Sequence, residues 1–391
     1  MVQKEGRGIQ VLLLCVFTVM LGLGIIGPII PIYAKSMGAT YSQVGLLGSI
    51  WSLSRLIFTP LVGHLSDIKG RKKIIAVGLL AYAIVSVLYA AAWDYPSLLS
   101  FRFLHGLGSA MSIPIAMAYA AEMAPGGREG RYMGSMNLAM FAGMGLGPLI
   151  GGYLGDNFSL HAPFYVMGAL AALSLILLMI FLPEAGEGVR KQTRPSFRTV
   201  LKSSLIRAAF IYRAVMALGI GGTMSFMALF ISGPEEDGGL ALSISLAGLI
   251  MSLSQVSSAL LQRPFGIVAD RYDKFRLVIL GGMTGALGYS LLPLSRSLTS
   301  LIGFLLLTSL GNAIGMPALT AMITIEGREV GMGTTMGIME GAMSIGMILG
   351  PLIYGLVVDS LGLRAAFLTT GIICVFGTLA FYLLHRTKTP S

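Results

Sequence analysis

Glu340 is the one acidic residue that lies deep within a long apolar segment of this sequence. On a helix, Gly337 and Ser344 would share its face, so its side chain should point toward small and polar groups rather than toward lipid. Burial disfavours the charged carboxylate and a nearby cation favours it, so such a group can exchange a proton for a bound molecule. The alternative is a protonated Glu340 that hydrogen-bonds Ser344 or a helix carbonyl.

A second set of polar groups, Arg102, His105 and Ser109, recurs at helical spacing and shares one face of another apolar segment. Arg102 lies six residues after Pro96, well inside that segment, where a charge is costly unless it has a partner or a task. Arg102 therefore either couples protons or contacts an anion, or it bonds backbone carbonyls in a structural role. His105 is either a titrating group or a packed, hydrogen-bonded ring.

Other charged and reactive groups need separate interpretation. Arg55, near the middle of a third segment, either lines a cavity and attracts an anionic group or bonds within its own half of the protein. Arg213 and Arg263 lie closer to segment ends and are expected to be anchors at the membrane surface. Cys15 and Cys374 have no metal-type or CxxC spacing, so neither a disulfide nor a metal site is predicted. No phosphate loop or nucleophile elbow accompanies these groups, so no enzyme chemistry is predicted.

Composition indicates which elements must position these groups. Of 391 residues, 55% are hydrophobic and 11% are charged, with a mean hydropathy of +0.82. Lipid must be the solvent for most of such a surface, which excludes a water-soluble globular protein. Apolar stretches of about 20 residues, long enough to cross a bilayer, occur at about 9–33, 43–65, 72–92, 96–121, 131–155, 161–183, 206–232, 242–268, 274–295, 297–323, 331–357 and 363–385. The predicted fold is an all-α membrane protein of twelve transmembrane helices.

An internal repeat divides the chain into two halves. A long polar segment, 184–205, separates residues 1–183 from residues 206–391, so we expect two six-helix bundles joined by a cytoplasmic linker. Landmark residues recur at an offset of 203 or 204, which indicates duplication. The pairs are Asp67 and Asp270, Glu122 and Glu326, Pro148 and Pro351, and Asp156 and Asp359. At this offset Glu340 corresponds to the neutral Asn137, so only one half has the acidic group.

Basic residues are distributed unequally between the two sides of the predicted membrane. Most of the 27 Lys and Arg residues, and with them the net charge of +10, fall at the N-terminus and in the loops on the same side. The positive-inside rule then places both termini in the cytoplasm, in an inner or plasma membrane. This distribution explains the basic charge, so no nucleic-acid partner is predicted.

The loop between the second and third spans carries a spaced group of small and charged residues. Gly63 permits close helix contact, Asp67 can face a helix N-terminus and Gly70 turns the chain ahead of Arg71. The spacing resembles the GxxxDxxGR(K/R) loop of the major facilitator superfamily. A degenerate copy follows the eighth span as Gly266, Asp270, Arg271 and Arg276. The alternative is a generic basic loop.

The fifth span carries small residues at regular intervals, which let helices approach closely. They are Gly134, Gly143, Gly147, Pro148, Gly151 and Gly152. The eleventh span repeats them as Gly337, Gly346, Gly350, Pro351 and Gly355, with Tyr354 in place of the first closing glycine. The pattern resembles the antiporter motif of the drug:proton antiporter branch of the superfamily. The alternative is the glycine-rich packing found in other transporters.

The resemblance extends over the whole chain. The run from Arg102 to Ser109 looks like the RxxqGxg element of the superfamily, with His105 where Gln is usual, and residues 22–33 contribute a GxGIIxPxxPxY run. The resemblance implies a major facilitator fold, with a proton-driven exporter as the nearest branch. The sequence departs from many such antiporters because its first, seventh and tenth spans contain no acidic residue.

Charged residues close the fourth and tenth spans and are expected to form gates on the cytoplasmic side. Glu122 lies near Arg128, and Glu326 lies near Arg328. Arg71 and Arg276 are the partners expected for the two glutamates.

These patterns predict a secondary active transporter rather than an enzyme, with two bundles that rock about a central cavity. The leading hypothesis is a proton-coupled exporter of hydrophobic or amphipathic small molecules, because some of the 24 methionines suit a promiscuous apolar pocket, although most are expected to be packing residues. The alternatives are a lipid or lysolipid translocator and a proton-coupled organic anion transporter, in which Arg55, Arg102 and His105 would attract the anion. We expect a monomer among membrane lipids, driven by the proton gradient, without cofactor or metal.

Overall fold

The computed structural model describes residues 2–124, 129–182 and 200–386, and within these ranges it is all helical. Twelve helices are long and apolar enough to cross a membrane, which confirms the predicted fold class. The first half contains α1 Val2–Ile26, α2 Ile29–Ser36, α3 Tyr41–Lys69, α4 Arg71–Ala90, α5 Tyr95–Met123, α6 Glu129–Asn157 and α7 Ala162–Phe181. The second half contains α9 Ser204–Ser232, η1 Glu235–Asp237, α10 Ile244–Arg271, α11 Lys274–Leu291, η2 Leu292–Leu294, α12 Leu298–Val330, α13 Met332–Leu361 and α14 Leu363–Arg386.

Two of the differences from the expected spans concern a break in a helix and the position of Glu326. The first span is broken between α1 and α2, where Gly27 donates its N–H to the carbonyl of Gly24 at 3.1 Å and Pro28 begins the next turn. Proline lacks an N–H and disfavours helical conformation in the residue before it, which accounts for the break. In the second half, α12 continues to Val330, so Glu326 lies on the helix and not after it.

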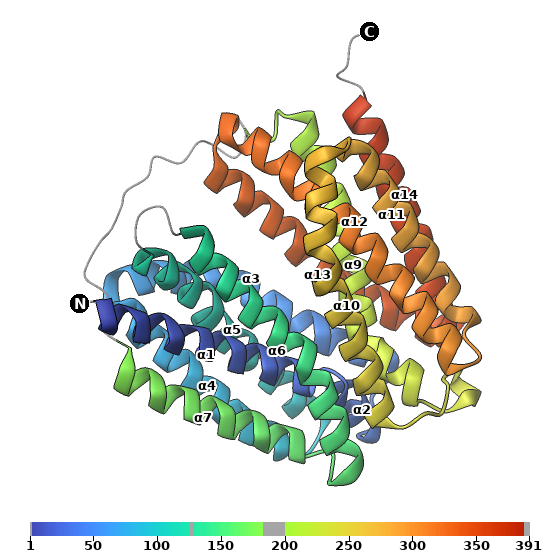
Figure 1. Ribbon diagram of the computed structural model, residues 1–391. Coiled ribbons are helices and arrows are strands. Elements are labelled where there is room, and N and C mark those ends of the chain that lie inside the picture. Colours follow the sequence, from blue (N-terminus) through green and yellow to red (C-terminus); the bar gives the residue numbers. More distant parts are fainter. Residues whose placement is uncertain (1, 125–128, 183–199, 387–391) are drawn as a thin grey trace.

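The helices form two bundles, α1–α7 and α9–α14, which meet at one end and diverge toward the other (Figure 1). The first residues of α1 and the last residues of α14 lie at the diverging end. We call this end the terminal face and the opposite end the distal face. The expected linker, 184–205, lies largely outside the described residues, which resume at Val200.

At the distal face, each bundle supplies a carboxylate to a helix N-terminus of the other bundle. Asp156, near the end of α6, accepts hydrogen bonds from the backbone N–H groups of Ile244 and Ser245 at 3.3 and 3.0 Å. These donors are the first residues of α10, whose N–H groups have no partner within the helix. The negative charge also lies at the positive end of the α10 dipole.

The second carboxylate contact is related to the first by the internal repeat. Asp359, near the end of α13, accepts from the N–H groups of Tyr41 and Ser42 at 3.0 and 2.8 Å, and also from the Ser42 hydroxyl. All residues of this contact lie 203 positions from their counterparts in the other. The duplicated aspartates therefore close the distal face symmetrically.

Just inside these contacts, the bundles cross backbone against backbone. A Cβ atom added at Gly45 of α3 would overlap the carbonyl oxygen of Pro351 on α13, and one added at Gly248 of α10 would overlap that of Pro148 on α6. The Ser49 hydroxyl donates to the carbonyl of Ile348 at 2.6 Å across the first crossing. Glycine is required at these crossings because no side chain fits between the helices.

Nearer the terminal face, glycines of α6 and α13 do not touch the opposite bundle. A Cβ atom added at Gly134 of α6, or at Gly337 or Gly341 of α13, would meet no atom within 4 Å. The bundles are therefore joined at the distal face, and the structure is open toward the terminal face.

Removing the charges from the distal contacts should shift the protein toward the state that is closed at the terminal face. Asp156→Asn combined with Asp359→Asn keeps an acceptor at each site but loses two charge–dipole interactions, worth roughly 0.6 to 2 kcal/mol together, or about three- to thirtyfold in population. Spin labels on Gly134→Cys and Gly337→Cys, where space is free, would report the distance between the terminal ends of α6 and α13.

Asp94→Asn is the matched control for this experiment. Asp94 caps its own helix, α5, through Ser97, and in the described part of the chain no hydrogen bond or ion pair joins it to the other bundle. An unchanged distance distribution in the double variant would show that the distal carboxylates do not set the conformation.

Candidate functional site

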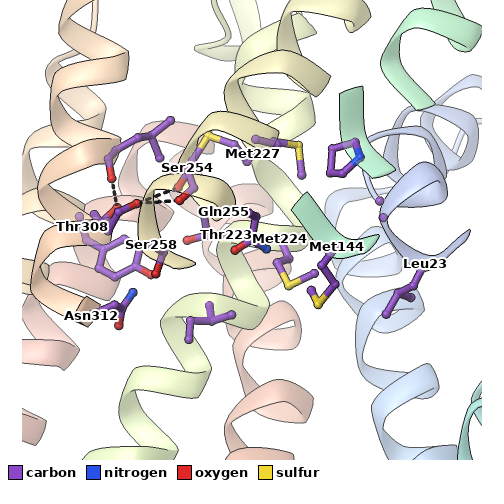
Figure 2. Close-up of a pocket in the computed structure, with 18 residues that line it drawn as sticks. Leu23, Met144, Thr223, Met224, Met227, Ser254, Gln255, Ser258, Thr308 and Asn312 are labelled. Atoms are coloured by element: carbon purple, nitrogen blue, oxygen red, sulfur yellow. Dashed lines mark hydrogen bonds between the residues drawn. The ribbon is translucent and has the colours of Figure 1, made fainter. Parts of the chain in front are cut away.

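A cavity of about 100 Å³ lies between the bundles, close to the distal crossings (Figure 2). The first bundle contributes residues of α1 and α6 to its wall, including Leu23, Met144 and Pro148. The second bundle contributes α9 through α12, including Gln255 and Asn312. The cavity therefore lies on the boundary between the two bundles.

Much of the polar wall of the cavity consists of repeat counterparts of the candidate residues in the first half. The offset of 203 pairs Trp51 with Ser254, Arg55 with Ser258, Arg102 with Leu305, His105 with Thr308, and Ser109 with Asn312. Every second-half member of these pairs lines the cavity. In four of the five pairs the first-half member is larger or charged and packs within its own bundle, whereas the second-half member is smaller and neutral; Ser109 and Asn312 are the exception. No sequence motif marks this wall, although the repeat offset relates its residues to the candidates of the first half.

In the first bundle, Arg102 and His105 lie together, as their shared face predicts, but they lie in the bundle core. His105 is fully buried, with its Nδ1 3.1 Å from the Tyr89 hydroxyl and 3.4 Å from Nη1 of Arg102. Its ring packs edge-on against Tyr82 at 4.5 Å. Arg102 donates from Nε to the carbonyl of Leu47 at 3.2 Å. These contacts match the structural alternative for Arg102 and the packed alternative for His105.

Trp51 and Arg55 connect this core to the second bundle. The Trp51 ring contacts the guanidinium groups of both Arg102 and Arg55, with ring centroids 5.7 and 5.8 Å from the two central carbons. Arg55 Nη2 then lies 3.9 Å from Glu340 Oε1, between α3 and α13. Glu340 therefore faces an arginine of the other bundle. No hydrogen bond links it to Ser344 among the described residues.

Arg213 was expected to be a surface anchor, and the structure corrects this expectation. Its Nε is buried without a hydrogen-bond partner among the described residues, and its Nη2 lies 3.8 Å from Sδ of Met343. The reason is that α13 packs along α9 and covers the guanidinium, which interacts electrostatically with Glu340. Arg263 is exposed on α10. Asn137, the counterpart of Glu340, is exposed on α6.

The twelve spans, the duplicated bundles and the cavity between them agree with a comparison of the whole chain with known families. The sequence model of the Major Facilitator Superfamily matches residues 12–238 and 214–391. The chain belongs to the major facilitator superfamily.

Individual relatives agree with this assignment. The chain is 30% identical over 392 residues to an uncharacterised MFS-type transporter of Methanocaldococcus jannaschii, covering 98% of this chain and 100% of that protein. It is 26% identical over 364 residues to the quinolone resistance protein NorA of Staphylococcus aureus, covering 90% of each chain. In fold it resembles a solved bacterial homologue of the human lysosomal transporter Spinster in an inward-facing, unoccupied conformation, with a TM-score of 0.85 over 99% of both chains at 16% identity. The protein is therefore a multi-pass membrane transporter and not an enzyme.

The loop that resembles the superfamily signature holds its charges within the first bundle. Gly70 has a φ of +92°, so the turn between α3 and α4 favours glycine. Arg71 lies 3.0 Å from Asp67 and donates from Nε to Glu122 at 2.9 Å. The expected pairing of Arg71 and Glu122 is thus present, and it joins α4 to α5.

The corresponding pairing in the second bundle is different. Glu326 accepts a hydrogen bond from the Ser203 hydroxyl, whereas Arg276 lies 3.8 Å from Asp273. The Arg276 side chain is 87% exposed at the start of α11, and its backbone N–H donates to the capping Asp273. Further residues of the expected gates, Asp270, Arg271 and Arg328, are exposed. Arg128 lies outside the described residues.

The glycines of α6 and α13, the two helices that resemble the antiporter motif, lie in different surroundings. A Cβ at Gly143, Gly147 or Gly151 would overlap the backbone of α1, and one at Gly346 or Gly350 would overlap that of α9. These glycines hold each bundle together. Three other positions lie against the opposite bundle at the distal crossings, namely Pro148, Pro351 and Gly152. Free space lies beside Gly134 and Gly337, and also beside Gly63 of α3.

Replacing Arg102 by lysine should destabilise the first bundle. Lysine keeps the charge but loses the planar donor that bonds the Leu47 carbonyl and contacts Trp51, so the free energy of unfolding should fall by about 1.5 to 3 kcal/mol. The thermal unfolding midpoint of the detergent-purified protein would measure this, with Arg263→Lys as the exposed control. Equal midpoints for the two variants would contradict a structural role for Arg102.

Proposed function

We propose that this transporter is a proton-coupled exporter of hydrophobic or amphipathic small molecules. In this proposal, substrate binds in the cavity between the bundles, and the bundles rock to expose it alternately to the two faces. The positive-inside rule makes the terminal face cytoplasmic, so the described conformation is open to the cytoplasm. The carrying observation is the Arg55–Glu340 pair, which spans the two bundles at 3.9 Å with the Glu340 side chain 58% exposed rather than buried as expected.

The position of Glu340 supports its role as the proton-binding group. The other acidic residues on the described spans lie within about one turn of a helix end. Glu340 instead lies between Arg55 of the first bundle and Arg213 of its own bundle. Protonation of Glu340 would remove the attraction between bundles and leave two arginines near each other, whereas ionisation would restore it. Proton binding and bundle movement are then linked by one contact.

Both the cavity and the relatives support an apolar or amphipathic substrate. Met144, Met224, Met227 and Met251 line the cavity, and methionine adapts to ligands of different shape. The Staphylococcus aureus relative is named for quinolone resistance. The glycine-rich α6 and α13 resemble the helices of drug:proton antiporters.

Glu340→Gln tests the coupling. Glutamine keeps the size of the side chain but cannot ionise, so substrate should still bind while substrate-induced proton movement is lost. Purified protein in liposomes containing pyranine would report that movement when a naphthalene compound with a carboxamide, trimethylammonium or carboxylate group is added under a pH gradient. Glu235→Gln, at an exposed position in η1, is the matched control and should behave as the unmodified protein.

The outcomes separate the proposal from its competitors. Proton flux that persists at the unmodified rate in Glu340→Gln would remove this residue as the coupling group. The absence of substrate-induced flux in the unmodified protein for every compound would refute proton coupling. Flux with the carboxylate alone would favour organic anion transport.

A further inference from the structure

The cavity between the bundles has two chemically different walls (Figure 2). Its polar side is formed by α10 and α12, which contribute Gln255, Ser258 and Asn312, while Leu23 of α1 and Met144 of α6 contribute apolar surface. No Asp, Glu, Lys, Arg or His is among the described residues that line it. A ligand in the cavity therefore meets one uncharged hydrogen-bonding wall and one apolar wall.

Part of the polar wall already has hydrogen-bond partners. The hydroxyls of Ser254 and Ser309 lie 3.1 Å apart, and Ser309 also donates to the carbonyl of Ser254. The Thr308 hydroxyl donates to the carbonyl of Leu305 at 2.7 Å. The Ser254–Ser309 bonds tie α10 to α12, whereas the Thr308 bond lies within α12. All three hydroxyls have partners, so they are not the groups that await a ligand.

Three polar side chains of this wall remain to be considered, those of Gln255, Ser258 and Asn312. None of their side chains hydrogen-bonds another described residue. Each amide offers two N–H donors and a carbonyl acceptor, and the hydroxyl offers one donor and two lone pairs. Polar groups beside an apolar wall are costly to leave unpaired, so water or a ligand must satisfy them. Their mixture of donors and acceptors suits a group that itself both donates and accepts.

The charged side chains of the Arg55–Glu340 pair do not contribute to the α10–α12 wall. Glu340 is engaged with Arg55, and neither residue lines the cavity. At the repeat position of Arg55, the cavity has the neutral Ser258. A cation or an anion in the cavity would therefore lose its hydration without gaining an opposite charge, which is unfavourable in a low-dielectric site.

We propose that the α10–α12 wall binds an uncharged head group that donates and accepts hydrogen bonds, such as an amide or a hydroxyl, while the apolar body of the molecule lies against the methionines. Gln255 and Asn312 are the specificity-determining residues. The inference rests on the proposed role of the cavity as the substrate site, and it is independent of the direction of transport and of the coupling ion.

Equilibrium binding tests the proposal on the purified full-length protein in nanodiscs, without a proton gradient. The probes are the three naphthalene compounds with a carboxamide, a trimethylammonium or a carboxylate group, measured by fluorescence anisotropy. Gln255→Leu and Asn312→Leu should each weaken carboxamide binding about three- to tenfold, because each removes one or more neutral hydrogen bonds. Binding of the two charged compounds should change by less than about twofold.

Gln262→Leu is the matched control, because Gln262 lies on the same helix two turns from Gln255 and does not line the cavity. Unchanged carboxamide binding in both variants, or an equal loss for the trimethylammonium compound, would overturn the proposal. Proton coupling is measured separately by pyranine, so its failure would leave the binding result standing. Failure of the binding result would likewise leave the coupling result standing.

Discussion

At the distal face, the Asp156 carboxylate caps α10 and the Asp359 carboxylate caps α3, so each bundle neutralises a helix N-terminus of the other. The constraint behind this arrangement is that a helix leaves its first N–H groups without internal partners, and such groups are costly near lipid. The contacts place glycine against proline carbonyl at the crossings below them. They also join the two bundles at the distal face.

The two halves share a backbone plan but use it for different purposes. On α3 and α5, the repeat positions hold Trp51, Arg102 and His105, whose rings and guanidinium pack into a closed core. On α10 and α12, the same positions hold small neutral residues, and a cavity results. The internal repeat supplies two equivalent faces, of which one is a packed core and the other is the wall of a cavity. The charges of the first half reach the second through Arg55 and Glu340.

Much of the fold could be predicted from the sequence because hydrophobic length determines spans and because the offset of 203 reveals the repeat. Asp156 and Asp359 could be recognised from the repeat offset. Their partners could not, because they lie in the opposite bundle and a local sequence pattern carries no information on contacts between bundles. Arg213 was misplaced for the same reason, since its depth depends on how α13 covers α9. The break at Pro28 had a local signal, because proline cannot continue the hydrogen-bond ladder.

The crossing with α3, at Gly45 and Pro351, divides α13 into a long and a short part. A rotation about the crossing would therefore move the two ends of α13 by different distances. From Pro351 to the start of α13 at Met332 is about 29 Å along the axis, and to Asp359 it is about 12 Å, at 1.5 Å per residue. A rigid rotation of about 10° around the crossing would move the terminal end by roughly 5 Å and the carboxylate by roughly 2 Å. The smaller displacement is enough to break the hydrogen bonds between the Asp359 carboxylate and the N–H groups that donate to it. In such a rotation α13 would act as a lever, with the Asp359 contact on its short arm and its terminal end on its long arm.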